Sequence, residues 1–227
     1  MTDDGILAVP DPEQALRWLR ERLTPDTDVW RHVVTELVPE GYPAYVRVFH
    51  SWTLEEVPGL RRTWREMAAA SGAYFHGELM GGAVRREMLS PPVGEQWEVF
   101  DGEPDPATRQ GLVEILSDAT AAEASQRIFY SYELARELRD EETLVWKSSL
   151  SGLEAVRART GEEYAGPEHW WPEDRGWVVA CDWDLSSTYV ACSEELAERL
   201  VGSDLVEAVR VAPTARIDNG ADHVNAF

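Results

Sequence analysis

Cysteine is scarce in this 227-residue chain, which contains only Cys181 and Cys192. If residues 177–183 and 188–192 pair as a hairpin, Cys181 lies opposite about position 190 and Cys192 opposite about position 179. The two cysteines are then diagonal neighbours roughly 7–8 Å apart. That separation lies outside comfortable disulfide geometry. We therefore expect free, buried thiols, which agrees with a cytoplasmic location.

Long apolar runs and a basic leader are also missing. No run approaches the roughly 18 residues that a membrane span needs, and residues 1–5 lack the basic start of a secretory signal. These features predict a cytoplasmic protein that does not bind membranes. The hydrophobic content of 44% is nevertheless enough to bury a core.

Positive charge is scarce as well, because Lys147 is the single lysine and 42 acidic residues face 21 basic ones. The net charge of -21 repels nucleic-acid phosphates, so we expect no nucleic-acid partner. An acidic surface can attract a basic protein, as in an inhibitor of a nuclease, or can simply keep the protein soluble. Both interpretations remain open.

The common catalytic and cofactor motifs are absent. Neither G-x-x-x-x-G-K-[ST] nor G-x-G-x-x-G occurs, which argues against nucleotide binding by those routes. The serine hydrolase motif G-x-S-x-G is also missing. Histidines are scattered at positions 32, 50, 76, 169 and 223, so a zinc site is not expected. We predict no cofactor.

Start and stop signals indicate several helices. Asp11 and Asp105 each precede a proline, which suits a capping residue followed by the first helical position. Ser151 opens a pattern that resembles a capping box, and Ser193 precedes acidic residues that favour a helix start. Gly72 follows an apolar helical spacing, so it is expected just after the last turn of another helix.

Runs of β-branched and aromatic residues indicate the strands. A Pro-Glu-Gly turn separates 33–38 from 44–49, which predicts a hairpin with Ala44, Val46 and Val48 facing the core. Further strands are expected at 127–133, 143–147, 177–183, 188–192 and 205–211. Hairpins mixed with helices predict an α+β fold with a mainly antiparallel sheet flanked by helices.

One domain is expected over residues 1–227. A weak boundary is possible within 77–104, although strands on both sides are expected to join one sheet. Residues 73–103 are rich in glycine and proline, which predicts a long irregular loop with one short helical turn. The tail 213–227 is expected to be loosely ordered.

Residues 169–190 hold the least usual chemistry of the chain, including Trp170 and Trp171. Consecutive tryptophans before a proline are expected to leave at least one partly exposed, and aromatic residues beside arginine are typical of protein interfaces. The alternative is that the two tryptophans cover a sheet edge. The candidate binding residues are His169, Trp170, Trp171, Asp174 and Arg175.

A second candidate site consists of Asp182 and Asp184. Alternation along a strand would place both carboxylates on one face roughly 7 Å apart, a distance compatible with a shared divalent cation or an acid/base pair. The alternative is a solvated turn formed with the following serines. Trp177 and Trp183 alternate onto the opposite face, so both are expected in the core.

The same stretch resembles an uncharacterised protein group common in actinobacteria. The resemblance rests on WWPEDR at 170–175, Trp177, the D-x-D at 182–184, STYV at 187–190 and the helix from 194 to 200, and on 40–45 and 48–50 nearer the N-terminus. Cys181 and Cys192 stand where the group has small residues. No activity is established for the group, so the resemblance implies a source and a fold but no mechanism.

Two functions therefore remain. The first is a non-enzymatic binding protein of the inhibitory or immunity type, whose acidic, tryptophan-rich surface engages a basic protein. The second is a small-molecule or metal-assisted enzyme that uses Asp182 and Asp184. The absence of catalytic motifs favours the first.

Overall fold

The strands of the chain form two sheets in the computed structural model, which describes residues 5–25, 32–54, 57, 59–85, 97–121, 127–137, 140–160, 166–218 and 220–225. The larger sheet has eight strands in the order β1-β7-β6-β8-β9-β10-β2-β11, and each neighbouring pair is antiparallel. Its strands are β1 (Leu7–Ala8), β2 (Ala44–Phe49), β6 (Ile128–Tyr132), β7 (Leu144–Ser148), β8 (His169–Pro172), β9 (Val178–Cys181), β10 (Ser187–Cys192) and β11 (Glu207–Val211).

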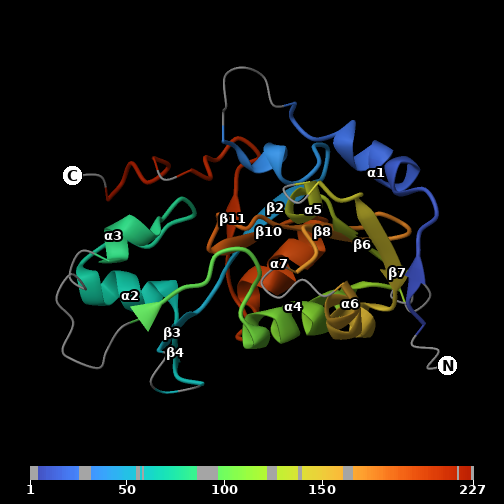
Figure 1. Ribbon diagram of the computed structural model, residues 1–227. Coiled ribbons are helices and arrows are strands. Elements are labelled where there is room, and N and C mark those ends of the chain that lie inside the picture. Colours follow the sequence, from blue (N-terminus) through green and yellow to red (C-terminus); the bar gives the residue numbers. More distant parts are fainter. Residues whose placement is uncertain are drawn as a thin grey trace.

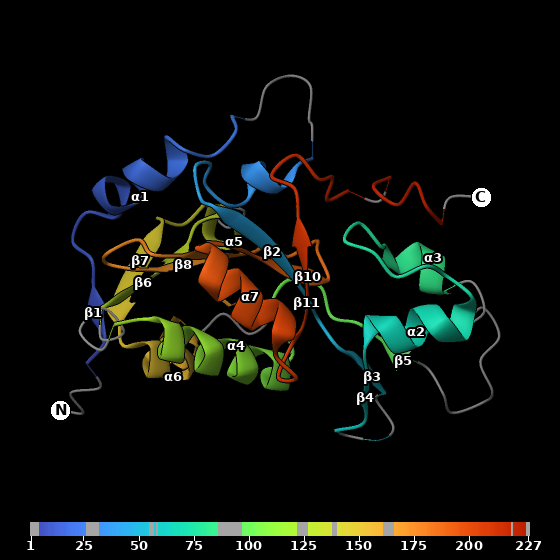
Figure 2. The same cartoon turned by 180° about the vertical axis from the view of Figure 1, so that it is seen from behind.

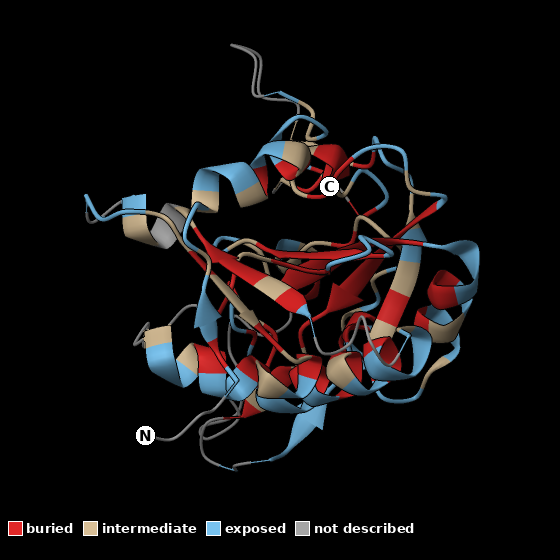
Figure 3. Ribbon diagram, turned by 90° about the vertical axis from the view of Figure 1, so that its right-hand side faces the viewer, coloured by how far each residue is buried: buried red, intermediate tan, exposed pale blue. Residues whose placement is uncertain are grey.

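Helices and loops cover both faces of this sheet (Figure 1). One face packs against α4 (Pro106–Ala119), α6 (Leu153–Thr160) and α7 (Glu194–Gly202). The other face packs against α1 (Pro12–Arg20) and the 3-10 helix η1 (Val34–Glu36). The central strands are consequently buried between two layers (Figure 3). The predicted α+β fold with a mainly antiparallel sheet is confirmed.

A smaller sheet and two helices form a second apolar cluster at one end of the molecule (Figure 2). The sheet consists of β4 (Arg61–Arg62), β3 (Trp52–Leu54) and β5 (Trp97–Glu98), and the helices are α2 (Trp64–Ser71) and α3 (Gly81–Arg85). The short helices α5 (Leu134–Glu137) and η4 (Leu150–Gly152) complete the fold. Strands from both sides of residues 77–104 join the large sheet, as expected.

Most predicted helix ends are confirmed by their hydrogen bonds. The Asp11 and Asp105 carboxylates accept from N–H groups three residues later, and so does the Ser193 hydroxyl. Gly72 adopts a φ of 72° after α2, a conformation that favours glycine. Ser151 does not cap α6, because it lies within η4 and α6 begins at Leu153.

Asp105 also anchors α4 to the second cluster. Its carboxylate accepts from the Thr108 hydroxyl at 2.6 Å and the Ser51 N–H at 2.9 Å, and it pairs with Arg61 at 3.0 Å. Burial by itself raises the pKa of Asp105, but these bonds outweigh burial and lower the pKa. The ionised carboxylate therefore stabilises the fold.

The predicted strand at 33–38 is wrong. Residues 34–36 form η1, and the Leu37 and Val38 N–H groups both donate to the Val34 carbonyl. The expected partner is not accessible, because both edges of β2 are occupied by β10 and β11. Ala44, Val46 and Val48 do face a core, but the alternate residues of β2 are buried as well, since both faces of the sheet are covered.

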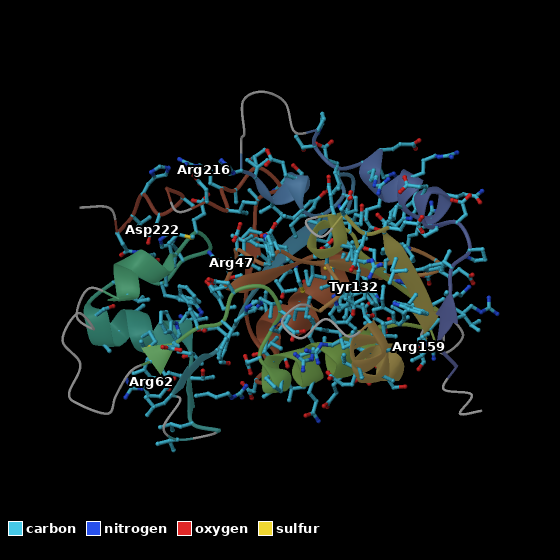
Figure 4. The ribbon with its side chains drawn as sticks, in the orientation of Figure 1. Arg47, Arg62, Tyr132, Arg159, Arg216 and Asp222 are labelled. Carbon is cyan, nitrogen blue, oxygen red and sulfur yellow. The ribbon has the colours of Figure 1, made fainter. Side chains whose placement is uncertain are left out.

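The described part of the C-terminal tail, expected to be loosely ordered, makes specific contacts. Ile217 is buried against the sheet, and Asp222 accepts a hydrogen bond from His76 at 2.9 Å near α3 (Figure 4). The Arg216 N–H donates to the Glu78 carboxylate at 2.8 Å. The tail and the loop before α3 thus hold each other in place.

Candidate functional site

Trp170 and Trp171, at least one of which was predicted to be partly exposed, are both buried. Trp170 and Trp171 are 1% and 2% exposed, because β8 lies inside the sheet between β6 and β9. Trp171 stacks on Phe129 with ring centroids 5.6 Å apart, whereas Trp170 meets Trp177 edge-on from the opposite face. The expectation that one of them is exposed, and the alternative of an edge position, are both wrong because a sheet covered on both faces buries consecutive residues.

Asp174 and Arg175 form the turn between β8 and β9. The Asp174 carboxylate accepts from the Gly176 N–H at 2.9 Å, and Arg175 has a φ of 58°. The Arg175 guanidinium lies 4.3 Å from the ring centre of Trp18, and the backbone carbonyl of Arg175 accepts a hydrogen bond from the Tyr42 hydroxyl. These exposed residues hold the turn against α1, at the opposite end of β9 from Asp182.

Asp182 and Asp184 do not alternate along a strand. β9 ends at Cys181, and the Leu185 N–H closes a turn on the Asp182 carbonyl at 3.0 Å. The Asp182 carboxylate accepts from the Asp184 N–H at 2.9 Å, so a turn is present, but Asp182 is half-buried and Ser187 already belongs to β10, which confirms the solvated-turn alternative only in part. Over the described part of the chain, no group of three or more histidine, cysteine or acidic residues is arranged to hold a metal ion.

The strand pairing also differs from the prediction by about two residues. Cys181 lies opposite Thr188, and Cys192 pairs with Ala44 of β2. Both cysteines are buried free thiols, as expected. Burial raises the pKa of each thiol to about 12, so neither is a ready nucleophile.

Cys181 is the end of a buried hydrogen-bond chain. The His50 Nδ1–H donates to the Phe100 carbonyl at 2.9 Å, which leaves Nε2 to accept from the Thr188 hydroxyl at 3.0 Å. The Thr188 oxygen lies 3.3 Å from the Cys181 sulfur. Burial lowers the pKa of His50 to about 4, so the imidazole is neutral. These hydrogen bonds hold Phe100 beside the turn at 182–185.

Trp183 is the exposed tryptophan of this region, with 46% of its surface accessible. The prediction that it lies in the core is wrong, whereas Trp177, 2% exposed, is buried as expected. The Gly102 N–H donates to the Leu185 carbonyl at 3.0 Å, and a Cβ on Gly102 would lie 3.4 Å from the Trp183 Cα. Phe100, 59% exposed, belongs to the same loop. Two aromatic side chains are therefore presented to solvent here.

Two adjoining pockets open beside Trp183. The first, of about 190 Å³, is lined by Leu37, Ala180 and Trp183 together with polar residues from four separate segments. The polar lining residues are Glu36, Glu103, Glu168, His169 and Asp182. The second pocket, of about 550 Å³, shares Glu36, Leu37 and Asp182 with the first and is also lined by Asp184 and Asp218.

The carboxylates of the first pocket differ in their partners. Glu103 is paired with Arg157, and Arg109 lies 3.6 Å from it. Asp182 has its pKa raised, chiefly by burial, although the Asp184 N–H counteracts this. Glu36 is half-buried and makes no side-chain hydrogen bond or ion pair within the described ranges. The pocket therefore favours a ligand that brings positive charge.

Of the predicted site residues, the structure brings His169, Asp182 and Asp184 to these pockets and leaves the others outside them. The prediction missed Glu36, Glu103, Glu168 and the exposure of Trp183. The polar turn sequence around Trp183 was a usable signal, because a tryptophan between two aspartates in a turn has no sheet neighbour to bury it.

The chain matches no protein-family model, no curated protein and no solved structure. The resemblance to an actinobacterial group stays a prediction. None of the described helices is long and apolar enough to cross a membrane.

Proposed function

We propose that the protein is a non-enzymatic, cytoplasmic binding protein of the inhibitory or immunity type, which engages a basic protein through the surface around Trp183. We define the Trp183 surface as Phe100, Asp182, Trp183 and Asp184. The observation that carries the proposal is the exposed Trp183 between two aspartates at the mouth of an acidic pocket. This surface replaces the one that the sequence predicted at 170–175.

The Trp183 surface combines aromatic contact area with negative charge. Exposed tryptophan supplies a large, rigid contact and dominates the energy of many protein interfaces. The net charge of -21 attracts a basic partner over a distance, and acidic residues beside the aromatic anchor favour the correct orientation. Neither feature requires a catalytic group, and burial keeps the Cys181 thiol and the His50 imidazole neutral.

The metal-assisted alternative has no comparable support. The Asp182 carboxylate already accepts a hydrogen bond from the Asp184 N–H in the turn. The alternative stays a prediction that calorimetry with Mg²⁺, Mn²⁺ and Ca²⁺ can test. Binding at millimolar metal that is lost in Asp182→Asn would favour it.

Affinity capture from a lysate of the source organism tests the proposed function. We expect wild type to retain a basic protein, Trp183→Ala to lose it, and Leu7→Ala to retain it. Leu7 is a matched control because it is an exposed apolar residue, 64% accessible, on the short edge strand β1. Retention should weaken as salt rises, since the attraction is screened.

Equal recovery of the same basic protein by folded Trp183→Ala and Leu7→Ala variants would contradict the proposal. Recovery that does not depend on salt would contradict its electrostatic part. Circular dichroism of each variant confirms that the comparison is made between folded proteins.

A further inference from the structure

We propose that the 190 Å³ pocket beside Trp183 receives one arginine side chain of the basic partner. The inference rests on the proposed function and names the chemical group that the same site recognises. It is carried by the size of the pocket, its charge and the aromatic ring of Trp183 beside it.

The size of the pocket favours a single side chain. Sites for drug-sized ligands occupy about 300–1,000 Å³, whereas this pocket holds about 190 Å³. Its lining includes apolar surface from Leu37 and Ala180, which suits an aliphatic stem. The same lining contains carboxylates, which suit the charged end of such a stem. A long cationic side chain combines both properties.

The charge of the pocket is not neutralised by its own lining. Acidic groups line it at Glu36, Glu103, Glu168 and Asp182, and the lining contains no lysine or arginine. Glu103 is already paired with Arg157 from α6. Glu36 is not paired with any described residue, and one oxygen of Asp182 is taken by the Asp184 N–H. Glu36 and Asp182 are therefore the carboxylates available to a cation.

His169 lines the pocket but has one nitrogen without a hydrogen bond among the described residues. Its Nε2–H donates to the Leu37 carbonyl at 2.8 Å, which leaves Nδ1 as an acceptor. Nδ1 is buried and makes no hydrogen bond with any residue that the structure describes. A buried acceptor without a donor costs free energy, but an atom closed to water is closed to a ligand as well, so the carboxylates and not this nitrogen are the groups that meet a cation.

Trp183 favours arginine over lysine. A guanidinium is planar, stacks on aromatic faces and carries five N–H donors, whereas an ammonium is a compact, strongly hydrated charge. The available acceptors, Glu36 and Asp182, come from η1 and the turn after β9. A group with several divergent donors meets such a spread of acceptors better than a point charge does.

Isothermal calorimetry with N-acetyl-arginine amide tests the inference without the partner. We expect wild type to bind it, and to bind the neutral citrulline analogue at least about tenfold more weakly because the charge is lost. The lysine analogue should bind more weakly than the arginine analogue. Saturating arginine amide should also release the captured basic protein.

Two variants remove the available carboxylates with little risk to folding. Glu36→Gln removes a group that makes no described side-chain bond, and Asp182→Asn keeps the oxygen that accepts from Asp184. Each should weaken arginine amide binding about tenfold or more. Glu114→Gln is the matched control, because Glu114 is exposed and lines a different pocket, and it should bind like wild type.

No binding of arginine amide at roughly 10 mM, equal binding of the citrulline analogue, or equal binding by Glu36→Gln and Glu114→Gln would each overturn the inference. These results leave the proposed function standing if Trp183→Ala still loses the basic protein. Conversely, arginine amide binding together with undiminished capture by Trp183→Ala supports the pocket and contradicts the proposed function.

Discussion

Replacing Trp171 with alanine is expected to destabilise the protein strongly, because this side chain belongs to the core. Trp171 is 2% exposed, stacks on Phe129 and meets Trp18 edge-on at 5.8 Å between ring centroids. Truncating a buried tryptophan lowers the free energy of unfolding by about 3–5 kcal/mol. Because the contacts with Phe129 and Trp18 are lost as well, we expect a value of about 4 kcal/mol for Trp171. For a chain of this length the midpoint temperature should fall by roughly 12 °C.

Thermal and urea unfolding followed by circular dichroism measure this loss. Trp183→Ala is the matched control, since it removes the same side chain from a site that is 46% exposed. Its cost should stay within about 1 kcal/mol. A Trp171→Ala variant no less stable than Trp183→Ala would refute the assignment of the two tryptophans.

Three further predictions follow from local geometry. Gly102→Ala should cost about 1–2 kcal/mol in urea unfolding, because φ is +92°, a backbone conformation that favours glycine, whereas the new Cβ would only touch Trp183 at an ordinary contact distance. Asp105→Asn should lower the free energy of unfolding by about 1–3 kcal/mol at neutral pH. Because folding lowers the pKa of Asp105, its stabilising contribution is present above the ordinary carboxyl range and disappears as pH falls through the folded pKa. The stabilities of wild type and variant should therefore converge in acid. A difference in stability between wild type and Asp105→Asn that persists or widens in acid would contradict this prediction. Cys181 and Cys192, with pKa values raised to about 12, should resist a thiol reagent in the native protein and react after unfolding, whereas rapid native labelling contradicts their burial.

The features predicted correctly from the sequence depend on neighbouring residues. The Asp11, Asp105 and Ser193 caps and the left-handed Gly72 are local hydrogen-bond or dihedral requirements, so a few residues suffice to identify them. Mixed hairpins and helices likewise predicted the α+β class.

The features predicted wrongly depend on what covers the sheet. Residues 33–38 have the composition of a strand, but both edges of β2 are taken by partners distant in sequence. Trp171 is buried because α1 and Tyr42 cover the face that carries it. Trp183 was assigned to a strand that ends two residues earlier. The first two arrangements are long-range and cannot be inferred from local pattern, whereas the turn around Trp183 is local and its polar sequence was a usable signal.

The candidate site was predicted only in part, because its pocket is assembled from distant segments. Asp182 and His169 come from the stretch that the sequence singled out, whereas Glu36 and Glu103 come from η1 and the loop before α4. Their sequence neighbourhoods contain many other acidic residues. Only the fold distinguishes them, since it places these carboxylates around one pocket.

Site-specific photocrosslinking at position 183 tests the central claim most directly. A photoreactive amino acid replaces Trp183 in one protein and the exposed Leu7 in another, and the crosslinked products are identified by mass spectrometry after irradiation in lysate. We predict a basic protein attached at position 183 and not at position 7, with a yield that falls as salt rises. Equal crosslinking of that protein at both positions, or none at 183, would contradict the assignment of the Trp183 surface as the binding site.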